Sequence, residues 1–395
     1  MFIPFLRLFA FFFVSSLSAL LVAAQSSSNG EPKSVDVPGG AGSSVAMDLS
    51  LRKPVVEVKI NGKGPFKLFL DTGAGATVLN HDLVEELKLP DEGKIRIGDP
   101  ADPQGIEGTQ NRVAVLEIGE AKFNDFVAVS WNRSALYRAG APRGVLGMPL
   151  FRKLLLTLDY PNGKVTIGKG SLPAADGKRI LAYKLGPSSL IALPLSVGGK
   201  SMTAMIDSGS QGVMSFPDSF KETIPLGGPV VEVGRGRTVG GEAIVYGAPL
   251  KGDVAFGEFS VANPNVTFFE RLRDPIVGFG FLSPYAMTID QANRRVKFEK
   301  VAAEAKAPVA TDPKLEEYAG TYGVRSVAAE GSDLFLQRTG GPRIRLIQVR
   351  PDEFALDVAG LEGVRVKFIR SAAGAVEQIS VLNPQGVWES VKKGS

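Results

Sequence analysis

Two short stretches of this chain place a carboxylate, a hydroxyl residue and a glycine directly after an apolar segment. They are Asp71, Thr72 and Gly73, and Asp207, Ser208 and Gly209. A carboxylate at the end of an apolar strand is costly to desolvate unless another group pairs with it. We therefore expect Asp71 and Asp207 to lie together. Because two adjacent carboxylates cannot both ionise readily, they would share one proton.

The surroundings of the two triplets also repeat along the chain. Each triplet follows an apolar strand pattern and a hairpin signal, Asn61-Gly62 or Gly198-Gly199. Each is followed later by two hydrophobic residues and a glycine, which are Val145, Leu146 and Gly147, and Ile276, Val277 and Gly278. The offset is 136 residues for the carboxylates (71 to 207) and 131 residues for these glycines (147 to 278). This spacing predicts an internal duplication.

With these motifs the chain resembles a single-chain bilobal aspartic protease of the pepsin and retropepsin type. Members of that family carry Asp-Thr/Ser-Gly and a later hydrophobic-hydrophobic-Gly element in each lobe. The resemblance covers roughly residues 50–300. It implies an all-β fold with two pepsin/retropepsin-like β-barrel lobes related by pseudo-two-fold symmetry.

The resemblance also implies the function, which is that of an aspartic-type endopeptidase. One carboxylate of the Asp71/Asp207 dyad would take a proton from a bound water, which attacks the peptide carbonyl, while the protonated partner hydrogen-bonds the carbonyl oxygen. Thr72 and Ser208 would hydrogen-bond across to the opposite loop. The glycines after them would let the loops approach without Cβ clashes. The expected partner is a peptide or protein substrate, and neither a cofactor nor a metal is expected.

The N-terminal residues predict export. Residues 1–24 hold a single charge, Arg7, and an apolar run that ends in small residues before Gln25. This pattern is typical of a cleaved signal peptide, so we expect a secreted or periplasmic protein without membrane association after cleavage. The alternative is an uncleaved N-terminal helix that anchors the protein.

Changes in composition suggest the domain boundaries. The segment rich in Ser, Gly and Pro after the signal peptide predicts a flexible linker, and a segment rich in Ala, Lys and Pro predicts a second one. Residues 317–322 resemble the opening of small β domains appended to bacterial secreted peptidases and hydrolases, and short alternating strands follow them. The expected parts are a signal peptide (1–24), a flexible linker (25–46), an N-terminal lobe (47–172), a C-terminal lobe (173–301), a linker (302–313) and an accessory antiparallel β domain (314–395).

Local signals within the lobes give further expectations. A short helix is predicted at 81–89, with Asn80 as N-cap and Pro90 as stop. A Gly- and Pro-rich hairpin at 97–111 lies where the family places its flap, although no clear counterpart of the flap tyrosine of pepsins is present. We interpret Asp159 and Asp290, which repeat as faithfully as the dyad, as structural turn residues.

Composition excludes several other chemistries. The chain has no cysteine and one histidine, His81, which excludes Cys-His catalysis and zinc sites built from His or Cys. The formal net charge of +4 is small for 395 residues and gives no reason to expect a nucleic-acid partner.

Two other classes of function remain open at this stage. The scaffold could be a catalytically silent peptide-binding protein, or a structural or adhesive envelope protein in which the tail domain does the work. Keeping both carboxylates favours the enzyme, because a binding module gains nothing from a like-charge pair. Since one chain carries both triplets, we expect a monomer.

Overall fold

The computed structural model describes thirteen stretches of the chain. They are residues 13–14, 30–39, 42–49, 51–97, 106–131, 142–186, 190–238, 241–301, 315–330, 333–338, 343–356, 364–382 and 388–394. These residues belong to two compact units. The larger comprises 16–232 and 237–304, and the smaller comprises 305–395 with 1–15 and 233–236. The predicted signal peptide lies outside the described residues except for β1 (Phe13–Val14), which pairs in parallel with Arg235 and Gly236.

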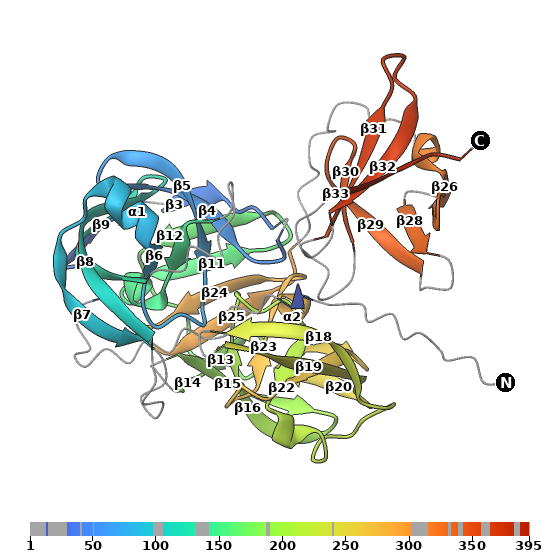
Figure 1. Cartoon of the computed structure of the whole chain (residues 1–395). Helices are drawn as coiled ribbons and strands as arrows, with labels where there is room; N and C mark the ends of the chain where they lie inside the picture. The colour runs from blue at the N-terminus through green and yellow to red at the C-terminus, as the bar shows by residue number, and fades with distance from the viewer. Residues whose placement is uncertain are drawn as a thin grey trace. The chain divides into compact units, whose positions relative to one another are not determined.

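The first lobe is built almost entirely of strands (Figure 1). Its elements are β2 (Ser34–Asp36), β3 (Ser43–Ala46), β4 (Val55–Ile60), β5 (Lys63–Leu70), β6 (Val78–Asn80), α1 (His81–Leu87), β7 (Asp91–Ile97), β8 (Ile106–Ile118), β9 (Ala121–Trp131), β10 (Gly144–Leu146), the 3-10 helix η2 (Met148–Phe151), β11 (Leu155–Asp159) and β12 (Lys164–Gly168). The pairing order β9-β6-β10-β5-β4-β8 closes into a barrel because β8 also pairs with β9.

The side-chain pattern of β4 shows why this sequence forms a barrel wall. Val56, Val58 and Ile60 are buried, whereas Glu57 and Lys59 between them are exposed. This period of two puts alternate side chains on opposite faces of the strand, one toward the core and one toward solvent.

The second lobe repeats the first. Its elements are β13 (Ile180–Ala182), β14 (Lys184–Leu185), β15 (Ile191–Val197), β16 (Lys200–Ile206), β17 (Met214–Phe216), η4 (Asp218–Phe220), β18 (Val231–Thr238), β19 (Gly241–Pro249), β20 (Asp253–Phe256), β21 (Phe259–Ala262), β22 (Asn265–Phe269), β23 (Ile276–Val277), α2 (Phe279–Leu282), β24 (Ala286–Asp290) and β25 (Arg295–Glu299).

Strand pairing confirms the duplication. In the first lobe β10 runs parallel to β5 and antiparallel to β6, and β6 runs parallel to β9. In the second lobe β23 runs parallel to β16 and antiparallel to β17, and β17 runs parallel to β22. The all-β fold of two related lobes is therefore as predicted.

The lobes also share one sheet, in the order β13-β25-β24-β11-β12-β3. At its centre β11 pairs antiparallel with its own counterpart, β24. Thr157 lies opposite Thr288, and their hydroxyls are 2.8 Å apart. Because these threonines are equivalent residues of the two repeats, the approximate two-fold relation passes between them.

Two local expectations need correction. The predicted flexible linker at 25–46 contains β2 and β3, which pair with β9 and β12. Partners far along the sequence stabilise these edge strands, and a composition rich in Ser and Gly does not reveal such partners. Helix α1 begins at His81 as predicted, but Asn80 makes no side-chain capping hydrogen bond, and the helix ends at Leu87 with Lys88 in the left-handed conformation.

The smaller unit contains an antiparallel meander, as predicted for the tail. Its elements are η5 (Leu315–Tyr318), β26 (Gly320–Tyr322), β27 (Arg325–Glu330), β28 (Asp333–Arg338), β29 (Arg343–Arg350), β30 (Glu353–Leu356), β31 (Arg365–Arg370), β32 (Val376–Leu382) and β33 (Trp388–Lys392). The strands pair in sequence order, and Tyr318, Tyr322, Phe354 and Phe368 form an aromatic core. The predicted linker at 302–313 lies outside the described residues.

Among the described residues there is no helix of the length and apolar character needed to span a bilayer. The proposed cleavage of a signal peptide therefore stays a prediction from sequence.

The glycines of the hydrophobic-hydrophobic-Gly elements give the first testable prediction. A Cβ on Gly147 would lie 2.3 Å from the carbonyl oxygen of Ala76, and one on Gly278 would lie 2.6 Å from that of Ser210. We expect Gly147→Ala and Gly278→Ala each to lower the free energy of unfolding by about 1–3 kcal/mol, because backbone must move. Gly168→Ala, whose Cβ would meet nothing within 4 Å, is the matched control. Equal urea unfolding curves for all three variants would contradict this packing.

Candidate active site

The two carboxylates begin the loops that follow equivalent strands. The amide of Asp71 donates to the carbonyl of Leu146 at 3.1 Å, and the amide of Asp207 donates to the carbonyl of Val277 at 2.9 Å. The second hydrophobic residue of each later element therefore fixes the backbone of the aspartate in its own lobe. This contact explains why the two motifs occur together in each repeat.

The residues just after these elements hold the loops from the other side. The amide of Met148 donates to Ala74 at 3.0 Å, and the amide of Phe279 donates to Ser210 at 2.8 Å. Gly147 donates its amide to the Thr77 hydroxyl at 3.2 Å. The two loops are thus supported by hydrogen bonds within their own lobes before any contact between lobes is counted.

The hydroxyl residues join the two loops reciprocally. The Thr72 amide donates to Ser208 Oγ and the Ser208 amide donates to Thr72 Oγ1, both at 3.0 Å. Thr72 Oγ1 also donates to the carbonyl of Ile206, and Ser208 Oγ donates to the carbonyl of Leu70, both at 2.8 Å. Each hydroxyl therefore binds the strand end that carries the opposite aspartate. These buried bonds are the cross-loop contacts that the resemblance implied.

Glycine is required on both loops because the carboxyl groups lie against them. A Cβ on Gly73 would lie 2.7 Å from Asp207 Cγ, and one on Gly209 would lie 2.6 Å from Asp71 Oδ2. The glycine amides also donate to the carboxylates of their own loops, Gly73 to Asp71 Oδ1 at 2.8 Å and Gly209 to Asp207 Oδ1 at 2.7 Å. Absence of a side chain thus allows close approach, and the freed space is filled by carboxylate.

The carboxyl groups form a buried, interacting pair. The exposed fractions of Asp71 and Asp207 are 1% and 0%, and the two side chains hydrogen-bond each other. Burial raises the pKa of both, and repulsion from Asp71 raises the pKa of Asp207 further. The glycine amides and the Lys53 ammonium act in the opposite direction. The pair therefore titrates as a unit that retains one proton over part of the pH range.

One oxygen of the pair is less well satisfied than the rest. Asp207 Oδ2 is buried, and the part of the chain that the structure describes offers it no hydrogen bond of good geometry. The interaction between the two carboxyl groups is thus a close approach rather than a fully aligned bond at this atom. A buried acceptor in this state favours a hydrogen-bonding ligand.

Sequence reasoning missed two residues near the pair. Lys53, which precedes β4, is only 4% exposed, and Tyr160, which follows β11, is 3% exposed. Burial raises the pKa of Tyr160, and both aspartates add to this effect. No signal in the sequence marked them, because Lys53 lies in a short basic turn and Tyr160 at a strand end. Only their contacts in the folded chain reveal a relation to the dyad.

The remaining candidates occupy structural positions. Asp159 accepts from the amide of Asn162, and the buried Asp290 accepts from the amides of Leu172 and Asn293, so both shape turns as predicted. His81 is 45% exposed and lies 3.4 Å from Glu85 on α1. Across the described residues, no group of three His, Cys, Asp or Glu side chains is arranged to hold a metal ion.

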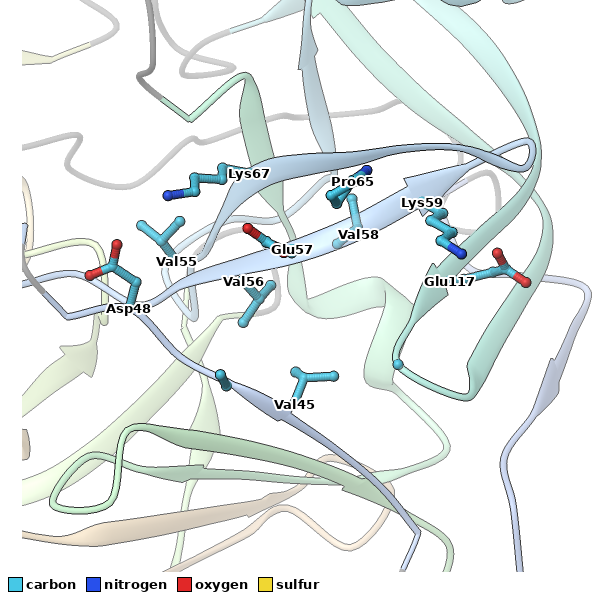
Figure 2. A pocket seen from close by; sticks show the side chains of 12 residues that line it. Val45, Asp48, Val55, Val56, Glu57, Val58, Lys59, Pro65, Lys67 and Glu117 are labelled. Carbon is cyan, nitrogen blue, oxygen red and sulfur yellow. The ribbon is translucent and has the colours of Figure 1, made fainter. Parts of the chain in front are cut away.

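An open pocket of about 640 Å³ lies beside β3 and β4, but neither aspartate lines it. Figure 2 shows Lys59 and Glu117 next to each other at one side of it, and Glu57 lies opposite Lys67 on the neighbouring strand. Its charges are therefore largely compensated by cross-strand neighbours. We assign the chemistry to the aspartate pair, because buried, coupled carboxylates are the groups able to move a proton.

Comparison with known families agrees with this fold and site. Residues 56–150, which include the first triplet and the first hydrophobic-hydrophobic-Gly element, match the model of a family described as aspartyl protease. The match supports the aspartic protease family and a peptidase function in general. It does not extend to the second lobe or to the tail. No curated protein matches the chain significantly.

The reciprocal hydroxyl bonds predict a stability effect. Thr72→Val keeps the shape of the side chain but leaves the Ile206 carbonyl and the Ser208 amide unpaired. We expect the free energy of unfolding to fall by roughly 1 kcal/mol for each lost bond, and more because the partners are buried. Ser44→Ala, which removes an exposed hydroxyl pair with Thr166, is the control and should change it by less than about 0.5 kcal/mol. Identical chemical unfolding of the Thr72 variant and the parent would count against this role.

Burial of the dyad predicts a dependence of stability on pH. Because the folded pair has raised pKa values, its proton-linked stability is complete below the ordinary carboxyl value of 3.8. That stability is lost as the pH rises through the raised values. Asp207→Asn removes one of these titrations and should raise the free energy of unfolding at pH 7, by about 1.4 kcal/mol per unit of pKa shift removed.

The comparison is unfolding from pH 4 to pH 8. The gain of Asp207→Asn over the parent should shrink toward pH 4, whereas the exposed control Asp253→Asn should show no such trend. A gain that is constant with pH, or a loss of stability at pH 7, would contradict a repulsive buried pair.

Proposed function

We propose that the chain is an aspartic-type endopeptidase that hydrolyses peptide bonds through a water activated by Asp71 and Asp207. The observation that carries this proposal is the pair of buried carboxyl groups, held together by reciprocal bonds between two equivalent loops. A structural ion pair would join opposite charges. Two like groups held this way are suited to share and transfer a proton.

The reaction follows from the one-proton state. The ionised carboxylate accepts a proton from water as the water oxygen bonds to the peptide carbonyl carbon. The protonated partner gives its proton to the carbonyl oxygen, which yields a tetrahedral diol. Transfer of a proton to the amide nitrogen and loss of one from a diol hydroxyl to the pair then break the C–N bond. This sequence returns the pair to its one-proton state.

Two features of the surroundings support this chemistry. The incompletely satisfied Asp207 Oδ2 is an acceptor for the attacking water or for the diol. Around the first loop, Ala74, Ala76 and Val78 cluster with Trp131, and Ile95 of the β7–β8 hairpin packs against this group. The hairpin is in the place expected for a flap, and its apolar contact with the loop gives it a route to cover a bound peptide.

The remaining assignments are part of the same proposal. One chain supplies both halves of the dyad, so a monomer suffices for activity. No cofactor is required, because the proposed steps need only the two carboxyl groups and water. The apolar N-terminal segment supports export as a secreted or periplasmic protein. The antiparallel tail carries no catalytic constellation and is proposed to be an accessory domain.

The test is peptide cleavage by the full chain and two variants. Asp71→Asn and Asp207→Asn should each abolish cleavage of unstructured peptides while preserving folding, since Asn keeps the shape but can neither take nor share a proton. Because the carboxyls act as a unit, the double variant should be no less active than either single variant. Asp159→Asn, which alters a turn carboxylate, should keep activity.

The activity of the parent should also follow a bell-shaped pH profile, since it requires one proton on the pair. Cleavage by both dyad variants at the parent's rate would overturn the proposal. Peptide binding by the parent with no cleavage at any pH would make a catalytically silent peptide-binding protein the better account.

A further inference from the structure

Lys53 is a buried cation in a molecule that buries few charges. Among the residues that the structure describes, it is the only basic side chain in the fully buried class, and the acidic residues in that class are Asp71, Asp207 and Asp290. Removing an ammonium from water costs several kcal/mol unless a negative group compensates it. The burial of Lys53 therefore calls for a carboxylate nearby.

The backbone on both sides of Lys53 is tied to both loops of the site. The carbonyl of Pro54 accepts from the amide of Leu70, the residue before Asp71, at 2.9 Å. The carbonyl of Leu51 accepts from Gln211 Nε2, on the second loop, at 3.1 Å. The short segment 51–54 thus bridges the ends of the two catalytic loops and places its lysine between them.

The side chain is oriented by an aromatic ring on the strand that carries Asp71. Lys53 Nζ lies 5.8 Å from the centroid of the Phe69 ring, within the range of a cation–π contact. The neighbouring Arg52 has its guanidinium 5.2 Å above the ring of Phe279 in the second lobe. Arg52 therefore points to a different aromatic residue, and Lys53 is the cation directed to the dyad.

The charged groups around this site identify the partner of Lys53. Its ammonium interacts electrostatically with both Asp71 and Asp207. The third buried carboxylate, Asp290, is instead bound by the amides of Leu172 and Asn293. Tyr160 is the other titratable group in the field of the dyad, and it is uncharged at neutral pH. The dyad is therefore the negative charge that compensates Lys53.

We propose that Lys53 is a built-in counter-ion of the Asp71/Asp207 pair and extends its one-proton state to lower pH. With the lysine charged, the buried group carries +1 when both carboxyls are protonated, 0 with one proton and −1 with none. The one-proton state is thus the neutral one. Only the catalytic consequence, an acid limb of activity at lower pH, rests on the proposed peptidase function.

The charge balance predicts a stability signature that needs no catalysis. Asp71→Asn/Asp207→Asn removes the negative charge and leaves Lys53 buried alone. This double variant should melt several degrees below either single variant, and its stability should rise with pH, because a buried lysine without a counter-ion favours its neutral form. Adding Lys53→Met should restore the melting temperature and remove the pH dependence.

Direct titration of the dyad tests the same inference in the active-site carboxyls. In full-length protein with ¹³C-labelled aspartate, Lys53→Met should move the first deprotonation of the pair up by about one pH unit. Lys53→Arg should keep it near the parent's value, and Lys63→Met, an exposed control on β5, should leave it unchanged. If Lys53→Met unfolds at neutral pH, it should refold on acidification, because the pair then takes up its second proton.

The outcomes separate this inference from the proposed function. An unchanged dyad titration in Lys53→Met, or a double variant that Lys53→Met fails to rescue, would overturn the counter-ion role whether or not the chain cleaves peptides. A shifted titration in a protein without peptidase activity would keep the counter-ion role and reject the enzyme. In an active protein, the acid limb of kcat/KM should move with the titration.

Discussion

The structure depends on holding two like carboxyl groups together in a place without solvent. Such a pair is unfavourable in isolation, and the surrounding contacts are arranged to offset this. Thr72 and Ser208 exchange amide and hydroxyl bonds across the loops, and the glycine amides donate to the carboxylates. With both loops tied in this way, neither aspartate can turn away from the other without breaking several buried hydrogen bonds.

The duplication explains how one chain creates this arrangement. Each repeat delivers an aspartate at the end of a strand and fixes it with the hydrophobic-hydrophobic-Gly element of the same repeat. The shared sheet, in which β11 pairs with β24, then sets the two repeats face to face. Symmetry is broken at the edges of the site, where Lys53 and Tyr160 come from the first repeat. The position equivalent to Tyr160 is Gln291, which bonds the Met148 carbonyl instead.

The sequence indicated the fold and the pair because both are encoded locally. A strand that ends in Asp, a hydroxyl residue and Gly can be recognised in a few residues, and its recurrence at a fixed offset adds weight. The strands β2 and β3 could not be predicted in this way, since only pairing with β9 and β12 makes a segment rich in Ser and Gly extended. Lys53 escaped notice for a related reason: a lysine beside an arginine suggests a solvated turn, and its burial arises from contacts with Leu70 and Gln211. The Asn80 cap failed because the helix start is held by β6, not by a side chain.

The most direct test of the account uses a peptide that imitates the tetrahedral diol. The purified full chain is incubated with a mixture of peptides across acidic to neutral pH, with and without a statine-type inhibitor, which places a hydroxyl where the reacting carbonyl would be. The account predicts new peptide termini that disappear when the inhibitor is present, since its hydroxyl would lie between Asp71 and Asp207. Cleavage that the inhibitor leaves unchanged, or no cleavage at any pH, would contradict a water-activating aspartate pair.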